Sequence, residues 1–145
     1  MEVLSTSLAE TKAVAQGFLG KIREKGNKNG ATIVGLRGDL GSGKTTFTQA
    51  AAEILGVKER VTSPTFVIMK KYKIFGPWET LIHIDAYRLE KAEELEKLNW
   101  PELAENPGNL ILVEWPERVA GVLPHDLISI NFKFIDEATR QINYE

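Results

Sequence analysis

The stretch LRGDLGSGKTTFTQA, residues 36–50, restricts the fold of this chain more than any other part of its sequence. Gly38, Gly43, Lys44 and Thr45 fit the pattern G-x-x-x-x-G-K-[ST]. In loops of this pattern, backbone N–H groups surround phosphate oxygens, the lysine reaches the β- and γ-phosphates, and the hydroxyl binds Mg²⁺. Glycine suits such a loop because it adopts positive φ and lets an anion approach where a Cβ would otherwise lie. The stretch therefore predicts a phosphate-binding loop, or P-loop.

The segments on either side of the loop predict a strand before it and a helix after it. Residues 31–36, ATIVGL, form a short apolar run that indicates a buried strand. Residues 44–56 place Phe47 and Ala51 at helical spacing and stop at Gly56. This order of elements directs the helix N-terminus, with its partial positive charge, toward an anion bound in the loop.

Apolar periodicity and turn residues indicate the remaining elements. A helix over 8–25 begins at a capping box made of Ser7 and Glu10. The acidic segment 90–109 is predicted to be helical in its first part, broken at Pro101 and again at Pro107-Gly108, and exposed to solvent. The predicted strands are a hairpin-like pair, a strand that ends in a carboxylate, and a closing antiparallel pair: 66–74 and 78–85, then 110–115, then 127–134 and 139–144.

Together these elements predict an α/β protein with a P-loop NTPase-like sandwich. The expected sheet is mixed, with a parallel core of the strands at 31–36 and 110–114 and added antiparallel strands. At 145 residues, with 43% hydrophobic and 26% charged residues, the chain is expected to form a single domain over 1–145.

Composition and charge exclude several classes of protein. Because the chain has no cysteine, it forms no disulfide, thiolate zinc site or cysteine nucleophile. The net charge of −2 and the lack of a dense Lys/Arg run predict no DNA partner and no RNA binding without help from another protein. No apolar run approaches the roughly 18 residues of a membrane span, and the N-terminal MEVLSTSLAET lacks the layout of a signal peptide. We therefore expect a cytoplasmic protein without a membrane partner.

Two carboxylates are candidates for acting on the magnesium ion. Asp85 ends the run LIHI and Glu114 ends LILV, and ligands of α/β proteins bind where parallel strands end. Either could act directly or through water, since Mg²⁺ takes only one or two carboxylates. The structural alternatives are a turn-capping acid for Asp85 and a surface acid at a strand end for Glu114. His83 shares a strand face with Asp85, which favours a structural partnership between the two. Three arginines lie near these motifs and could neutralise phosphate charge: Arg37, Arg88 and Arg118.

Other classes of nucleotide protein fit the sequence less well. A GTPase needs a guanine-reading N/T-K-x-D motif after a later strand, and the chain has none, which favours ATP. A small-molecule kinase needs a lid and an acceptor pocket with clustered arginines, for which 145 residues leave little room. A nucleotide-gated interaction module, which binds the nucleotide without turning it over, stays open.

Four motifs in this order resemble the bacterial TsaE (YjeE-type) P-loop ATPase family of tRNA threonylcarbamoyladenosine biosynthesis. They are GDLGSGKTTFTQ, VTSPTF, HIDAYRL and LVEWPERVAGVLP, and the resemblance covers essentially residues 7–140. The last three are not general to P-loop proteins. The resemblance implies that ATP and Mg²⁺ are the cofactors.

The resemblance also implies roles for individual residues. Thr45 and Glu114 would ligate Mg²⁺, and Asp85 would lie close to the γ-phosphate. SPTF (63–66) and HIDAYRL (83–89) would be switch segments, and SPTF could sense the γ-phosphate through the hydroxyl of Ser63 or Thr65. Lys44 and Asp85 with Thr65 form the expected catalytic set. The expected nucleotide-binding set is Thr11, on the adenine side, and the loop residues Asp39, Leu40, Gly41, Ser42, Gly43, Lys44, Thr45 and Thr46.

The partners implied by the resemblance are the TsaD and TsaB proteins of the modification complex. In such a complex, ATP binding and hydrolysis drive repeated cycles that place a threonylcarbamoyl group on the adenosine beside the tRNA anticodon. TsaD and TsaB would carry that chemistry and most of the RNA contact, so tRNA is an indirect partner of this chain. This expectation agrees with the slightly acidic composition.

Overall fold

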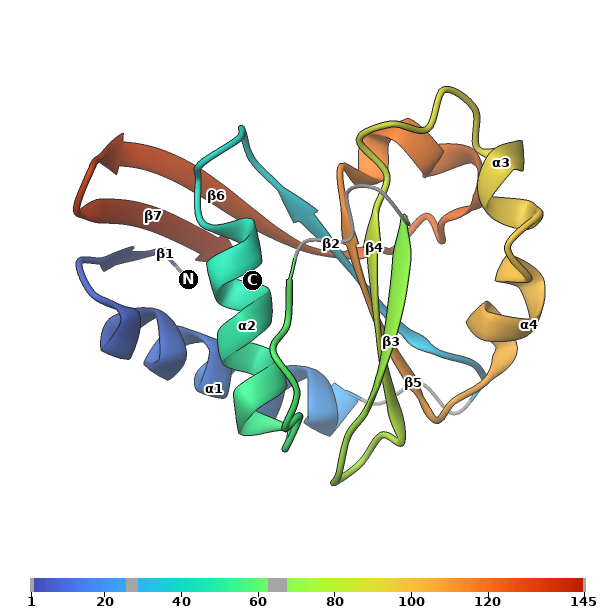
Figure 1. Cartoon of the computed structure of the whole chain (residues 1–145), viewed down its shortest axis with the longest axis horizontal. Coiled ribbons are helices and arrows are strands. Elements are labelled where there is room, and N and C mark those ends of the chain that lie inside the picture. Colours follow the sequence, from blue (N-terminus) through green and yellow to red (C-terminus); the bar gives the residue numbers. More distant parts are fainter. Residues whose placement is uncertain (1, 26–28, 63–67, 145) are drawn as a thin grey trace.

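The computed structural model describes residues 2–25, 29–62 and 68–144, which form one mixed sheet and the helices that pack on it (Figure 1). The sheet has seven strands in the order β1-β7-β6-β2-β5-β4-β3. The strands are β1 (Glu2–Ser5), β2 (Thr32–Arg37), β3 (Met69–Lys73), β4 (Thr80–Asp85), β5 (Asn109–Glu114), β6 (Ile128–Asp136) and β7 (Thr139–Tyr144). The helices are α1 (Leu8–Lys25), α2 (Lys44–Ile54), α3 (Glu93–Glu96), α4 (Trp100–Glu105) and the 3₁₀ helix η1 (Pro116–Val122).

The expected fold class is confirmed, and its parallel core is wider than the sequence indicated. The four central strands, β6, β2, β5 and β4, run parallel to one another. Antiparallel strands extend both edges, with β3 paired to β4, β7 to β6 and β1 to β7. β4 joins the core because its residues from Leu81 to Asp85 are all buried, as is typical of parallel strands covered on both faces.

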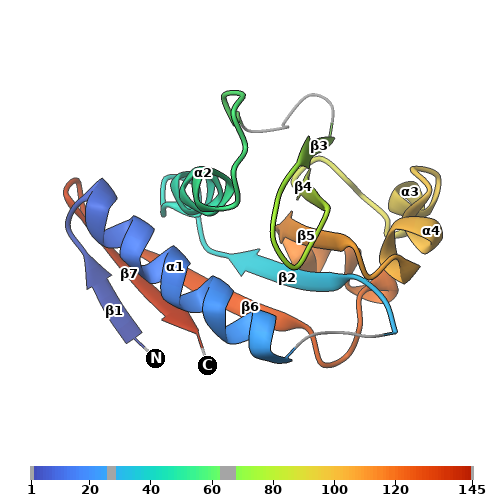
Figure 2. The same ribbon diagram turned by 90° about the horizontal axis from the view of Figure 1, so that it is seen from below.

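Helices cover both faces of this sheet. Along β5, Leu110 and Leu112 pack into the cluster that contains α1 and α2, whereas Ile111 and Val113 pack into the cluster that contains α3, α4 and η1. This alternation follows from the two-residue period of a strand. α1 and α2 contact each other through Phe18 of α1 and Phe47 of α2, whose ring centroids lie 5.9 Å apart. Figure 2 shows α1 running along β6 and β7, with α3 and α4 at the far end of the sheet.

The prediction for the acidic segment 90–109 is wrong in two respects. Pro101 stands in the first turn of α4 instead of breaking a helix, because a proline there lacks only an N–H that has no intrahelical acceptor. The segment is also not simply exposed. Leu95 is fully buried, and Trp100 is 4% exposed and donates its indole N–H to the carbonyl of Val122 at 3.2 Å. These two side chains anchor the segment to the second core cluster.

The strand β1 has no counterpart among the predicted elements. It is four residues long, too short for a periodic signal, and it forms by pairing with β7 from the other end of the chain. β1 leads directly into α1, which has the predicted bounds. In the described part of the chain, no helix is long and apolar enough to cross a membrane.

Candidate functional site

The loop after β2 turns so tightly that two of its positions require glycine. At Gly38, a Cβ would lie 2.6 Å from the carbonyl oxygen of Phe132 and 2.6 Å from Oγ of Ser42. At Gly43 there is room for a side chain, but φ is 106°, a left-handed conformation that other residues adopt only with strain. The two glycines of the P-loop pattern therefore permit the observed path of the backbone.

The N-terminus of α2 faces the inside of this loop. The bond from Phe47 N to Gly43 O, 2.9 Å, is the first i to i−4 bond of the helix. The N–H groups of Lys44, Thr45 and Thr46 precede it and have no intrahelical acceptor. Three donors and the positive end of a helix dipole therefore lie where the sequence predicts phosphate binding.

Ser42 contributes an unusual polar atom to the same loop. Its side chain is 1% exposed, and its Oγ has no hydrogen-bond partner among the residues that the structure describes. An unpaired buried hydroxyl costs free energy, on the order of 1–3 kcal/mol. An oxygen-rich ligand in the loop would supply the missing partner.

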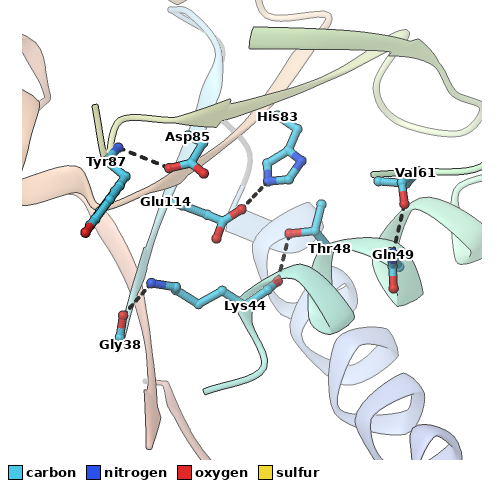
Figure 3. Close-up of polar contacts among 9 residues, drawn as sticks. All are labelled: Gly38, Lys44, Thr48, Gln49, Val61, His83, Asp85, Tyr87 and Glu114. Atoms are coloured by element: carbon cyan, nitrogen blue, oxygen red, sulfur yellow. Dashed lines mark hydrogen bonds and ion pairs between the residues drawn. The ribbon is translucent and has the colours of Figure 1, made fainter. Parts of the chain in front are cut away.

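Lys44 is a buried cation surrounded by acidic groups. It is 4% exposed, and its Nζ donates to the carbonyl of Gly38 (Figure 3). The same atom lies 3.8 Å from the centroid of the Trp115 ring. Burial lowers the pKa of Lys44, while the charges of Glu114 and Asp85 oppose that effect. Its ammonium group therefore has little water around it and gains from a nearby anion.

Asp85 and Glu114 stand side by side at the ends of neighbouring parallel strands. They are register partners in the β4–β5 pair, and both are buried. Oδ1 of Asp85 accepts a hydrogen bond from the backbone N–H of Tyr87 at 3.0 Å, which shapes the turn after β4. Asp85 thus has the turn-capping contact named above as its structural alternative, and it also lines the pocket described below.

The expected pairing of His83 with Asp85 is wrong, because His83 pairs with Glu114. Nε2 of His83 lies 2.6 Å from Oε2 of Glu114, and the His83 side chain is fully buried. Asp85 turns instead to the N–H of Tyr87, whereas Glu114, on the next strand, is long enough to reach His83 (Figure 3). A face shared within one strand was therefore insufficient to identify the partner.

Lys44, Asp85 and Glu114 line one pocket of about 750 Å³ together with the P-loop. Its walls are the start of α1, the P-loop, the ends of β4 and β5, and the β6–β7 hairpin. From the expected site it contains the following residues: Thr11, Leu40, Gly41, Ser42, Gly43, Lys44, Thr45, Thr46, Asp85 and Glu114. Asp39 does not line it. The whole segment SPTF, with Thr65, falls within 63–67, outside the described residues.

Thr11 reaches the pocket from the first turn of α1. It is 7% exposed, and its Oγ1 lies 2.6 Å from Oγ of Ser5. Half of the predicted capping box of α1 is present: the N–H of Glu10 donates to Oγ of Ser7 at 3.1 Å, but the Glu10 carboxylate accepts from the N–H of Thr6 at 3.2 Å instead of that of Ser7. The helix start is thus fixed by local contacts beside the pocket.

Several pocket residues are absent from the predicted site, and two of them, Arg140 and Trp115, contact the P-loop. Nε of Arg140 donates to the carbonyl of Gly41 at 2.9 Å, which ties β7 to the P-loop. Trp115 holds its ring under Lys44 from a left-handed backbone conformation with φ 59°. Arg140 is 99 positions from Gly41 in sequence, so local pattern could not indicate it. Trp115 directly follows Glu114, and its place in the motif LVEWPERVAGVLP was an available signal.

The three arginines expected to neutralise phosphate lie elsewhere. Arg37 pairs with Glu117 at 3.4 Å on the surface, and Arg118 lies over the ring of Tyr87 at 5.6 Å. Neither of them, nor Arg88, is among the described residues that line the pocket. Arg140 is the arginine found there instead.

The sheet and the loop define the class of this protein. A parallel strand that runs into a G-x-x-x-x-G-K-T loop and then a helix is the P-loop NTPase-like arrangement. The crystal structure of YdiB from Bacillus subtilis is similar, with a TM-score of 0.73 and 30% sequence identity over 99% of this chain and 83% of that one. This class is that of nucleotide-binding proteins.

Sequence comparison then gives the family. A family model described as threonylcarbamoyl adenosine biosynthesis protein TsaE matches residues 5–142. The TsaE protein of Rickettsia bellii is 36% identical over 98% of this chain and 92% of its own length, and that of Bacillus subtilis is 38% identical over 93% and 78%. The chain belongs to the TsaE family, whose members are named for the biosynthesis of threonylcarbamoyladenosine in tRNA.

Proposed function

We propose that this chain is the ATP-binding and ATP-hydrolysing subunit of the tRNA threonylcarbamoyladenosine modification complex, and that it cycles a TsaD–TsaB pair. The observation that carries the proposal is the convergence of Lys44, Asp85 and Glu114 on one pocket beside the P-loop. In a member of the TsaE family, this set of groups is suited to phosphoryl transfer from ATP.

The loop fits a triphosphate on three grounds. At Gly38 the packing leaves no room for a Cβ, so glycine permits the tight loop whose N–H groups would bind phosphate oxygens. The orphaned Oγ of Ser42 gains a partner from such a ligand. Lys44, already buried, gains an anion for an ammonium group that now bonds to a carbonyl. The unpaired hydroxyl of Ser42 and the buried ammonium group of Lys44 are both unfavourable without an anion.

The same pocket also fits a magnesium ion. Thr45 and Glu114 supply the hydroxyl and the carboxylate, and both line the pocket. Mg²⁺ keeps most of its waters and takes only one or two carboxylates, so this small donor set suits it. When bound with the nucleotide, the ion would neutralise charge that develops on the phosphates.

The protein groups then divide the work of hydrolysis. Lys44 would bind the charge of the β- and γ-phosphates, and Glu114 and Thr45 would hold the metal. Asp85, beside Glu114 at the strand end, orients the attacking water by accepting its hydrogen bond. Thr65 remains a predicted switch residue outside the described part of the chain.

The partner assignment extends the role suggested by the family name. With a net charge of −2, the chain is a poor candidate for binding tRNA by itself, so we place the RNA contact on TsaD and TsaB. The complex would work in the cytoplasm, without DNA or membrane as a partner.

A nucleotide-gated module that binds ATP without hydrolysing it is the second candidate. The observation in its favour is the bond from Tyr87 N to Oδ1 of Asp85, because a turn-capping role accounts for that acid without catalysis. Steady-state ATP turnover distinguishes the two candidates, since the module would show none.

Competition between nucleotides tests the base assignment. Unlabelled ATP should displace a fluorescent adenine nucleotide at least about tenfold better than GTP, a difference of about 1.4 kcal/mol. The reason is the lack of a guanine-reading motif in the chain. Both competitors carry the same triphosphate, so the P-loop contributes equally to each. Equal displacement by ATP and GTP would contradict the preference for ATP and make a GTPase possible again.

A further inference from the structure

The buried bond between His83 and Glu114 has no part in the roles proposed above. A carboxylate only accepts hydrogen bonds, so Nε2 of His83 is the donor in the 2.6 Å contact. Nδ1, the other ring nitrogen, has no hydrogen-bond partner in the parts of the chain that the structure describes. The bond to Glu114 is therefore the polar contact that orients the ring.

This bond engages one of the two carboxylate oxygens of Glu114. The dashed contact in Figure 3 joins Oε2 to His83, while the other oxygen points away from the ring, toward the side on which Lys44 lies. Lys44 and Glu114 both line the pocket. The free oxygen of Glu114 is thus directed toward the P-loop side of the pocket.

Without His83, nothing described would hold this oxygen in place. Glu114 is 4% exposed, so its carboxylate needs donors from the protein or a bound cation. A glutamate side chain has three rotatable bonds, and a fixed hydrogen bond at one oxygen limits the directions of the other. Residues that orient a metal ligand in this way affect metal affinity by about 10- to 100-fold.

We propose that His83 is the positioning residue of the magnesium carboxylate: its Nε2–H holds Oε2 of Glu114 so that Oε1 faces the metal. This inference rests on the proposed function, because it requires Glu114 to act on the ion that accompanies ATP. His83 does not line the pocket among the described residues, so it acts through Glu114 and touches neither the nucleotide nor the metal.

The role predicts a metal-specific defect. Loss of His83 leaves the P-loop glycines, the N-terminus of α2 and Lys44 in place, so ATP binding without metal should be nearly unchanged. The contribution of Mg²⁺ to binding should fall. A merely structural role would weaken binding equally with and without metal.

The test compares three variants by the affinity for fluorescently labelled ATP, in EDTA and across a Mg²⁺ titration. His83→Leu removes the donor, and His83→Gln keeps an amide N–H able to reach the same oxygen. Trp78→Phe is the matched control, because it removes another buried hydrogen bond, Trp78 Nε1 to Thr32 Oγ1 at 3.1 Å, away from the pocket. Circular dichroism and thermal melting check that each variant is folded, and His83→Phe, a flat ring that also lacks a donor, replaces His83→Leu if the latter melts below the assay temperature.

We expect the Mg²⁺ midpoint to rise about tenfold in His83→Leu, with affinity in EDTA within about twofold of wild type. His83→Gln should lie near wild type, as should Trp78→Phe. An unchanged midpoint in His83→Leu overturns the inference, as does an equal loss of affinity in EDTA and in Mg²⁺. Failure of the wild-type chain to bind labelled ATP in Mg²⁺ would instead contradict the proposed function itself.

Discussion

Mg-ATP should raise the melting temperature of the wild-type chain and leave that of Lys44→Ala almost unchanged. A ligand that binds only the native state stabilises it by RT ln(1 + [L]/Kd), about 2.7 kcal/mol at a hundredfold excess over Kd. Lys44 is the buried cation of the pocket, and it lies at the N-terminus of α2, beside the N–H groups of the first turn that have no intrahelical acceptor. Its removal takes away the charge that the β- and γ-phosphates meet.

The shift is measured for each variant against its own melting temperature without nucleotide. This reference is needed because Lys44→Ala also deprives Glu114 and Asp85 of a nearby cation. Lys12→Ala is the matched control, since Lys12 is exposed, pairs with Glu53 at 2.9 Å and does not line the pocket. Equal shifts of the melting temperature in wild type and Lys44→Ala would contradict the assignment of the phosphate site to the P-loop.

The two strand-end carboxylates should fail in different ways when neutralised. Glu114→Gln should raise the Mg²⁺ concentration needed for ATP turnover by about tenfold or more, because it removes charge from the metal ligand. Asp85→Asn should lower kcat by roughly 10²- to 10⁴-fold, because the attacking water loses the carboxylate that orients it, with nucleotide affinity nearly unchanged.

The contacts of Glu114 and Asp85 allow each substitution to remove the charge without breaking the observed hydrogen bond. The amide oxygen of Gln can still accept from Nε2 of His83, and that of Asn can still accept from the N–H of Tyr87. Each variant therefore keeps its local contact and loses its charge. Glu117→Gln, at an exposed acid paired with Arg37, controls for charge near the site. A raised Mg²⁺ requirement in Asp85→Asn with normal metal dependence in Glu114→Gln would exchange the two roles.

What the sequence predicted well is what depends on local pattern. The P-loop spacing, the apolar run before it and the helical spacing after it lie within residues 31–56, and the structure forms all three. The two carboxylates that the sequence pointed to lie side by side, because acids that end buried parallel strands come together at one edge of the sheet, while their action on a metal or on water stays a prediction.

What the sequence could not give depends on contacts between distant segments. β1 exists because β7 pairs with it, and Arg140 reaches Gly41 across 99 positions. The partner of His83 was missed because alternation gives the face of a strand but not how far a neighbouring side chain reaches. Pro101 was misread as a breaker because the same residue is compatible with the first turn of a helix.

Steady-state ATP turnover, with and without a TsaD–TsaB pair, is the most direct test of the proposed function. P-loop ATPases hydrolyse slowly when nothing orders a loop around the γ-phosphate, and a partner that does so accelerates them. We expect slow turnover by the chain alone, a rise of about two orders of magnitude or more with the pair, and neither in Lys44→Ala. Turnover that is absent in the presence of the pair, or equal in wild type and Lys44→Ala, would contradict the proposed function.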